Sequence, residues 1–255
     1  MPLKTVAIIQ ARMNSSRLPG KMLMDIAGKP LIERVIERAI AAEIFDDVLV
    51  ATSDDSNDDE LARFCNTRGI HVFRGSLNDV LSRYWQAAES VHADVIARLT
   101  GDCPLLDPEV IRAVVTMFHN GNFSYVSNVI ERTFPDGLDT EIFSFSALEA
   151  ANQEARLPSE REHVTPFIHK NPQRFAMGHF KQEIDLSVLR WTVDEKRDLE
   201  FVRRVFTEIG KDIFSMEETL ALLQKKPDLQ KINEGIPMNE GMQKSLEEDK
   251  RFLKE

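Results

Sequence analysis

The chain of 255 residues is poor in cysteine and histidine, and this scarcity excludes several kinds of site. Its two cysteines, Cys65 and Cys103, form no CxxC motif and no cluster with histidine, so neither a disulfide framework nor a structural zinc site is indicated. The six histidines show no metal-ligand spacing, which argues against a zinc enzyme. Because disulfides are rare in reducing compartments, we expect a cytoplasmic protein.

Long apolar segments and an excess of positive charge are also missing. No apolar run approaches the ~20 residues that a membrane-spanning helix needs, and the first residues, MPLKTVAIIQAR, lack the pattern of a signal peptide. The formal net charge of −10 argues against binding to nucleic acid or to anionic membranes, because both need a basic surface. Cations gathered in one loop of such an acidic chain instead suggest a small anionic ligand.

The first half of the chain alternates between strand and helix patterns. Short apolar runs predict strands over 4–10, 46–53, 70–75 and 93–102, and apolar residues at helical spacing predict helices over 30–43, 56–69, 77–91 and 107–121. Ser56 is the expected N-cap of the second helix, and Asp107 and Pro108 are expected to begin the fourth. Alternation of this kind predicts an α/β fold with a mainly parallel sheet flanked by helices.

Beyond residue 122 the pattern changes. Strands are expected in FSYVSNV, GLDTEIFSF, RFAMGHFK and LRWT, of which RFAMGHFK alternates like an antiparallel strand, and the last forty residues read as charged helices. We therefore expect a single domain over residues 1–215 and a helical C-terminal extension over 216–255. Within the domain, a smaller antiparallel insertion at about 122–190 would serve acceptor binding or dimerisation.

The most conspicuous polar loop follows the first predicted strand. The segment ARMNSSRLPGK carries Arg12, Asn14, Ser15, Ser16, Arg17 and Lys21. Hydroxyls, cations and backbone N–H groups between a strand and a helix suit a phosphate chain. The loop is not a Walker P-loop, which requires GxxxxGK[ST], and a merely solvated basic turn is the simpler alternative.

The same loop resembles the signature of the sugar-acid cytidylyltransferases, which activate 3-deoxy-manno-octulosonate and acylneuraminate with CTP. IIQARMNSSRLPGKML matches their I-P-A-R…R-L-P-G-K pattern, with Gln10 in place of proline as in the spore-coat polysaccharide branch. Further matching blocks are VLVATSDDSNDDELA, FRGSLNDVLSRYWQAA, RLTGDCPLLDP, FPDGLDTEIFSFSALEAA, EREHVT and VDEKRDL. The resemblance implies a Rossmann-like nucleotide-diphospho-sugar transferase fold of the GT-A type.

Two aspartates stand at the ends of predicted strands. Asp102 follows the strand ending in RLTG, and Asp194 follows RWTV; the resemblance implies that both hold Mg²⁺. In the second motif Glu195, Lys196 and Arg197 replace the family's T-P-E. Each aspartate has an alternative interpretation: Asp102 as the start of a turn, and Asp194 as a group that favours the following helix dipole.

The resemblance also implies roles for other residues. Arg12, Lys21 and Asp102 are the expected catalytic residues. The expected nucleotide-binding residues are Gln10, Ala11, Arg12, Asn14, Ser15, Ser16, Arg17, Lys21, Ser53, Arg74, Ser76 and Arg83. The expected acceptor-binding residues are Asp136, Asp139, Glu141, Arg161, Glu162 and His163, although a histidine in an amphipathic helix is more often a hydrogen-bonded structural residue.

These expectations describe an Mg²⁺-dependent transfer of CMP from CTP to a sugar acid or phosphorylated acceptor, with release of pyrophosphate, for surface polysaccharide synthesis. Catalysis would consist mainly of positioning and charge stabilisation. The resemblance also implies a homodimer. Two alternatives stay open: a glycosyltransferase on a related fold, for which no D-x-D motif is evident, and a non-catalytic nucleotide-binding protein of polysaccharide assembly.

Overall fold

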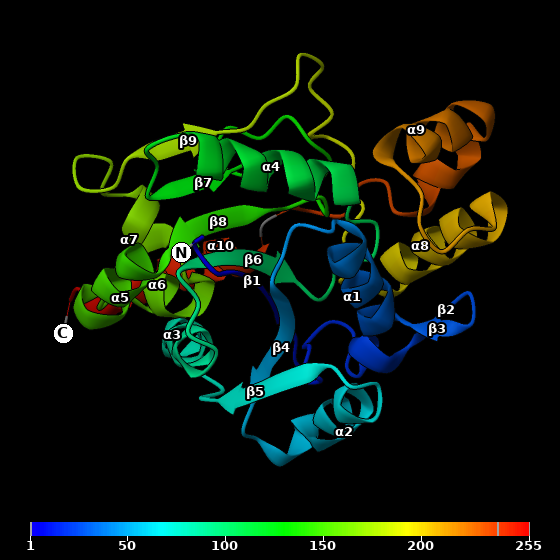
Figure 1. The fold of residues 1–255 in the computed structure, drawn as a ribbon. Helices are drawn as coiled ribbons and strands as arrows, with labels where there is room; N and C mark the ends of the chain where they lie inside the picture. The colour runs from blue at the N-terminus through cyan, green and yellow to red at the C-terminus, as the bar shows by residue number, and fades with distance from the viewer. Residues whose placement is uncertain (1, 239, 255) are drawn as a thin grey trace.

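The computed structural model describes residues 2–238 and 240–254 and is built around one seven-stranded sheet (Figure 1). The strand order is β5-β4-β1-β6-β8-β7-β9. All the pairings are parallel except those of β8, which runs antiparallel to both β6 and β7. The strands are β1 (Thr5–Gln10), β4 (Asp47–Ser53), β5 (His71–Gly75), β6 (Val95–Thr100), β7 (Tyr125–Ser127), β8 (Glu141–Ser144) and β9 (Met177–His179).

Alternation along the central strands produces two hydrophobic cores, one on each face of the sheet. In β1, Ala7 and Ile9 belong to one core, whereas Val6 and Ile8 belong to the other. Both sets are fully buried, because helices cover both faces, as a parallel sheet requires. In Figure 1, α1 and α4 lie over one face and α3 and α5 over the other.

The predicted helices of the first half are confirmed, with one correction at a cap. The bounds are α1 (Leu31–Ala41), α2 (Asp59–Thr67), α3 (Val80–Ser90) and α4 (Pro108–Asn120). The Asp107 carboxylate accepts from the N–H of Glu109, as expected for the N-cap of α4. Ser56, however, lies within a 3₁₀ turn (Ser56–Asp58) ahead of α2, and the Asp55 side chain accepts the Asn57 N–H instead. Asp55 thus caps the 3₁₀ turn, and α2 continues directly from that turn without a side-chain cap of its own.

The described residues after 122 extend the main sheet and form no separate one. The prediction that RFAMGHFK is antiparallel is wrong, because β9 pairs in parallel with β7; alternating burial on an edge strand does not specify direction. The segment LRWT forms no strand. Its Arg190 makes a single β-bridge with Asp136. The helices here are α5 (Phe145–Glu154), α6 (Pro158–His163) and α7 (Pro166–His169), and a hairpin of β2 (Asp25–Ile26) and β3 (Lys29–Pro30) was not expected.

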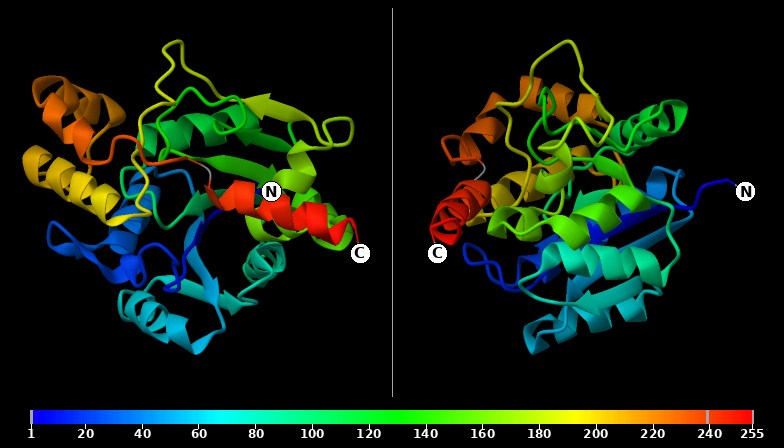
Figure 2. Two further views of the ribbon diagram at one scale, coloured as in Figure 1. Left: turned by 180° about the vertical axis from the view of Figure 1, so that it is seen from behind. Right: turned by 90° about the vertical axis from the view of Figure 1, so that its left-hand side faces the viewer.

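The last part of the chain returns to the body of the molecule. It contains α8 (Lys196–Ile209), α9 (Met216–Lys225), a 3₁₀ segment (Pro227–Ile232) and α10 (Glu240–Phe252). Figure 2 shows α10, in red, running beside α6. The buried Asp249 carboxylate fixes this contact, accepting from the Ser159 N–H at 2.8 Å and the Ser159 hydroxyl at 2.6 Å.

In the sheet, β4 pairs with β1 on one side and β6 pairs with it on the other, so the strand order reverses at β1. This reversal of strand order places a ligand crevice at the carboxyl ends of β1 and β6. Gly101 allows the two loops to meet there: a Cβ at this position would lie 2.9 Å from the Gln10 carbonyl oxygen. Its own N–H donates to that oxygen at 2.8 Å.

We expect Asp249→Ala to loosen α10 while the sheet stays folded. The substitution leaves the N–H and hydroxyl of the buried Ser159 without an acceptor, which costs about 1–3 kcal/mol. Hydrogen exchange should become faster in α10 and α6 but not in β1 or β6. Lys250→Ala, at an exposed position of the same helix, is the control. Unchanged protection of α10 in Asp249→Ala would contradict this account of how the helix is held.

Candidate active site

The loop after β1 is a rigid turn that delivers Lys21 to the crevice. The Met13 carbonyl accepts hydrogen bonds from the N–H groups of Ser15 and Gly20. Gly20 has a left-handed φ of 75°, which glycine adopts without strain, and a short 3₁₀ helix begins at the next residue. On the other side, the Met13 N–H donates to the buried Asp58 carboxylate at 2.6 Å, which ties the loop to the end of β4.

The Lys21 ammonium lies between the two aspartates. Its Nζ donates to Asp102 Oδ2 at 3.0 Å, to Asp194 Oδ1 at 2.9 Å and to the Val193 carbonyl at 2.7 Å. The Lys21 side chain is 6% exposed, so the charge is held by protein groups rather than by bulk water. The Val193 N–H also donates to the Asp102 carbonyl at 2.8 Å, which fixes the two aspartate-bearing segments against each other.

The charges in this trio stabilise one another. Burial lowers the pKa of Lys21, but the attraction of Asp102 and Asp194 is stronger, and the pKa is raised above its ordinary value. For Asp102, burial acts to raise the pKa, and the charge and hydrogen bond of Lys21 outweigh it, so the pKa is lowered. At neutral pH the lysine is therefore an ammonium and Asp102 is a carboxylate.

Asp194 carries more than one cation. Its Oδ2 accepts from Arg17 Nη2 at 2.9 Å and from Arg190 Nη2 at 3.1 Å. Arg190 in turn pairs with the fully buried Asp198, both contacts being 3.0 Å. Asp198 also accepts the N–H groups of Asp194 and Glu195 ahead of α8, as the N3 residue of a capping box.

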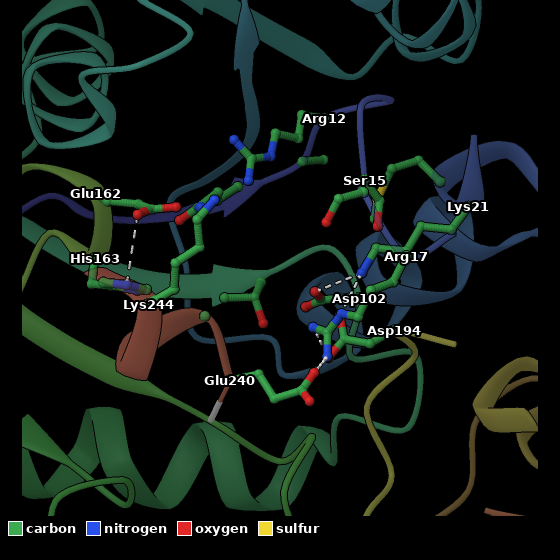
Figure 3. A pocket seen from close by; sticks show the side chains of 16 residues that line it. Arg12, Ser15, Arg17, Lys21, Asp102, Glu162, His163, Asp194, Glu240 and Lys244 are labelled. Carbon is green, nitrogen blue, oxygen red and sulfur yellow. Dashed lines mark hydrogen bonds and ion pairs between the residues drawn. The ribbon is translucent and has the colours of Figure 1, made fainter. Parts of the chain in front are cut away.

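A cavity of about 470 Å³ opens above this network (Figure 3). Its walls come from the loop after β1, the end of β6, the segment before α8, the end of α6 and the start of α10. The lining residues are Gln10, Ala11, Arg12, Ser15, Ser16, Arg17, Lys21, Met22, Thr100, Asp102, Glu162, His163, Asp194, Glu240, Gly241 and Lys244.

A second cavity of about 510 Å³ shares the wall formed by Arg17, Asp102, His163 and Asp194. Two acid–base pairs lie along it. Arg132 donates to both oxygens of Asp139 at 2.6 and 2.7 Å, and the buried Glu141 pairs with Arg98. Four of the expected acceptor residues line this cavity: Asp136, Asp139, Glu141 and His163.

Asp136 is the acid of this second cavity with the weakest pairing. It lies 3.4 Å from Arg190 and 3.8 Å from Arg132, whose guanidinium is already occupied by Asp139. Burial is the main cause that raises the pKa of Asp136, and repulsion by Asp139 adds to it; the two arginines act in the opposite direction. The pKa reaches about 7.

Several expected site residues lie outside both cavities. The fully buried Ser53 donates its hydroxyl to Asp58, and Arg74 binds the Ser53 and Asp55 carbonyls. Arg161 is engaged with Asp79 and Asn152. Neither Asn14 nor Ser76 lines either cavity.

Arg83 differs from the others, because it is fully buried although it lies on a helix. Its Nη1 donates to the Ser76 carbonyl, whereas its Nε and Nη2 have no partner in the described part of the chain.

Five charged lining residues were not found by sequence reasoning, and one of them, Arg132, lies between β7 and β8. Glu240 and Lys244 come from α10, in a charged tail to which no role was given, and Arg98 and Arg190 lie within predicted strands. A charged residue inside an apolar strand pattern, such as Arg98 in VIARLT, was the available signal, because it is rarely buried without a partner. No local sequence pattern indicates that Lys244 belongs to the site.

The surroundings of Cys103 and His163 show whether the first could act as a nucleophile and the second as an acid–base group. Burial, together with repulsion by Asp102, raises the pKa of the Cys103 thiol well above its ordinary value, so it is a neutral thiol and a poor nucleophile. Burial lowers the pKa of His163 despite the nearby Glu162. Its Nε2 lies 3.0 Å from the Ser245 hydroxyl of α10, a contact that a neutral imidazole can make.

The donor set fits a divalent cation that also binds phosphate. Within residues 2–238 and 240–254 there is no group of three or more His, Cys, Asp or Glu side chains able to hold a metal ion. Mg²⁺, however, is usually held by one or two carboxylates together with phosphate oxygens and water. Asp102 and Asp194 already converge on a single cationic atom, the Lys21 nitrogen.

A loop of cations and hydroxyls and a pair of aspartates lie at the switch point of a parallel sheet, where α/β proteins bind their ligands. The cytidylyltransferase family model matches residues 6–236, so the chain belongs to the cytidylyltransferase family and is a nucleotidyltransferase. The expected resemblance to the sugar-acid and spore-coat enzymes is confirmed. The chain is 32% identical to the spore coat polysaccharide biosynthesis protein SpsF of Bacillus subtilis over 87% of its length and 94% of that protein's.

Two further comparisons agree. A 3-deoxy-manno-octulosonate cytidylyltransferase of Chlamydia trachomatis is 29% identical over 83% of this chain and 84% of its own. The structure of a cytidylyltransferase from Leptospira borgpetersenii superposes with a TM-score of 0.87 at 34% identity, covering 92% of this chain and 99% of that one. Among the helices described, none is long and apolar enough to cross a membrane.

The raised pKa of Asp136 predicts a stability that falls as the pH rises. The unfolded side chain ionises near 3.8 and the folded one near 7, so folding binds a proton between these values. Its contribution is therefore complete below about pH 4 and is lost as the pH rises through 7. Because Asp136→Asn cannot ionise at this position, we expect this dependence of stability on pH to be absent from the variant.

We expect the difference in free energy of unfolding, Asp136→Asn minus wild type, to grow between pH 4.5 and 7 and to level off above pH 8. The difference can reach about 4 kcal/mol, because one pKa unit corresponds to about 1.4 kcal/mol. Urea unfolding at five pH values measures it. Comparison of the two proteins cancels the contributions of all other ionisable groups. A difference that stays constant with pH would show that Asp136 ionises normally.

Proposed function

We propose that this enzyme transfers CMP from CTP to a hydroxyl of a sugar acid or phosphorylated acceptor, releases pyrophosphate, and serves surface polysaccharide synthesis. The observation that carries the proposal is the convergence of Lys21, Asp102 and Asp194 beside a loop of cations and hydroxyls. The names of the Bacillus and Chlamydia relatives support the acceptor class and the biosynthetic setting.

In this proposal the loop after β1 binds the phosphate chain. Arg12 and the hydroxyls of Ser15 and Ser16 line the cavity without an acidic partner in the described part of the chain, so their donors are available to phosphate oxygens. Lys21 would stabilise the negative charge that develops on the leaving pyrophosphate. Donors fixed in advance lower such a barrier, because they need not reorganise during the reaction.

Asp102 and Asp194 would hold Mg²⁺, which, when bound, neutralises phosphate charge and lowers the pKa of an acceptor hydroxyl. The second cavity would hold the acceptor next to these aspartates. Its arginines, Arg132 and Arg190, suit an acidic acceptor, although each also faces a carboxylate. Binding the nucleotide and the acceptor in adjacent cavities supplies the alignment that an in-line attack on the α-phosphorus needs.

Lys21→Met tests the phosphate assignment. The variant keeps the length of the side chain and removes its charge, so we expect kcat/KM to fall by on the order of 10²–10³-fold, the usual effect of losing one donor to a transition-state oxyanion. Pyrophosphate release from CTP and a sugar acid is the assay. Lys29→Met is the matched control, since that lysine also forms ion pairs but belongs to the β2–β3 hairpin. Near-normal turnover of folded Lys21→Met would reject the assignment.

Asp102→Asn tests the metal assignment. The pKa of Asp102 is lowered, so the wild-type side chain is a carboxylate throughout the neutral range. Its replacement by a neutral amide should raise the Mg²⁺ concentration for half-maximal activity at least tenfold and lower the maximal rate. Activity titrated with Mg²⁺ from micromolar to tens of millimolar measures both. An unchanged Mg²⁺ midpoint would exclude Asp102 as a ligand.

Thermal unfolding with Mg²⁺ and each of CTP, UTP, GTP and ATP tests the choice of donor. A ligand at a hundred times its dissociation constant adds about 2.7 kcal/mol to the free energy of unfolding, a shift of several degrees for a chain of this size. We expect that shift for CTP alone. A shift with a nucleotide sugar and with no triphosphate would favour the alternative, a glycosyltransferase.

A further inference from the structure

The C-terminal helix α10 brings a fourth cation to the nucleotide cavity. Lys244 lines it together with Arg12, Arg17 and Lys21, and Figure 3 shows its side chain extending from α10 into the cavity on the side where Arg12 lies. The neighbouring second cavity is lined by other residues of α10 but not by Lys244. The position of Lys244 therefore concerns the nucleotide side of the site.

The pairing of the four cations separates them into two groups. Arg17 is bound to Asp194 and Glu240, and Lys21 is bound to Asp102 and Asp194. Arg12 and Lys244, by contrast, form no ion pair with any described residue, although Glu240 and Glu248 lie one helical turn from Lys244 on either side. Two cations that face one cavity and lack acidic partners are suited to a ligand with several negative charges.

The placement of Lys244 is fixed by its neighbours on the helix. The next residue, Ser245, is buried; it donates its hydroxyl to Glu162 at 2.5 Å and lies 3.0 Å from His163 Nε2. One turn further on, Asp249 holds Ser159. These two polar contacts, four residues apart, fix the rotation of α10 against α6. Lys244 is thereby held at the edge of this interface, facing the cavity.

We propose that Lys244 binds the phosphate chain of the nucleotide together with Arg12, and that α10 is part of the substrate site. This inference rests on the proposed function. The triphosphate carries about four negative charges, whereas four carboxylates already line the cavity: Asp102, Glu162, Asp194 and Glu240. Lys244 brings the cations of the lining to four, equal in number to its carboxylates, and so reduces the repulsion that a phosphate chain meets there.

The test compares binding of CTP and of CMP, with Mg²⁺ and without acceptor, by isothermal titration calorimetry. Lys244→Ala should weaken CTP binding about tenfold, the effect of losing one charged hydrogen bond, and should leave CMP binding within twofold of wild type. Lys244→Arg should restore most of the affinity for CTP. Lys250→Ala is the control, because it removes an exposed lysine of the same helix that lines neither cavity.

Each result has one meaning. If wild type binds CTP more tightly than CMP and Lys244→Ala binds CTP equally well, the inference is wrong while the proposed function stands. If Lys244→Ala weakens CTP and CMP alike, the lysine does not act on the β- and γ-phosphates and the inference is also wrong. If wild type binds no CTP, the proposed function fails and the inference with it. Unfolding temperatures and hydrogen exchange in α10 verify that the helix stays docked in every variant.

Discussion

The contact on which the site depends is the Lys21 ammonium between Asp102 and Asp194. It joins a loop after the first strand to the end of β6 and to a segment 173 residues away in the sequence. A nearly buried ammonium is stable only with acidic partners, and two carboxylates at close range are stable only with a cation between them. Each of the three segments therefore requires the other two, and the switch point of the sheet is where they can meet.

The parts of this arrangement that local patterns encode were accessible from sequence. Strand and helix alternation predicts the sheet, and the loop RMNSSRLPGK and the aspartates after two apolar runs predict the crevice, because strand ends gather at one edge. The burial of Ser53 and Arg83 and the docking of α10 were not accessible. They depend on partners such as Asp58 and Asp249, which lie on other elements and leave no periodic signal in the chain.

Charge is distributed in this protein so that acids and cations neutralise each other within the cavity wall. Asp194 is shared by Lys21, Arg17 and Arg190, and Asp198 keeps Arg190 in place from behind. Sharing of this kind offsets the repulsion between neighbouring carboxylates. It also means that a cation entering between the aspartates would compete with Lys21, whose released ammonium would then lie next to the same phosphate chain.

The second cavity differs from the first because it contains an acid, Asp136, whose pKa of about 7 lies at neutral pH. Asp139 takes both donors of Arg132, so the repulsion between Asp139 and Asp136 is only partly offset. An acceptor carboxylate in this cavity would add a further negative charge and would raise the pKa of Asp136 again, because like charges disfavour ionisation. Proton uptake by Asp136 would leave Arg132 and Arg190 with more positive potential toward the acceptor. An acidic acceptor would thus create part of its own binding site, whereas a neutral sugar would not.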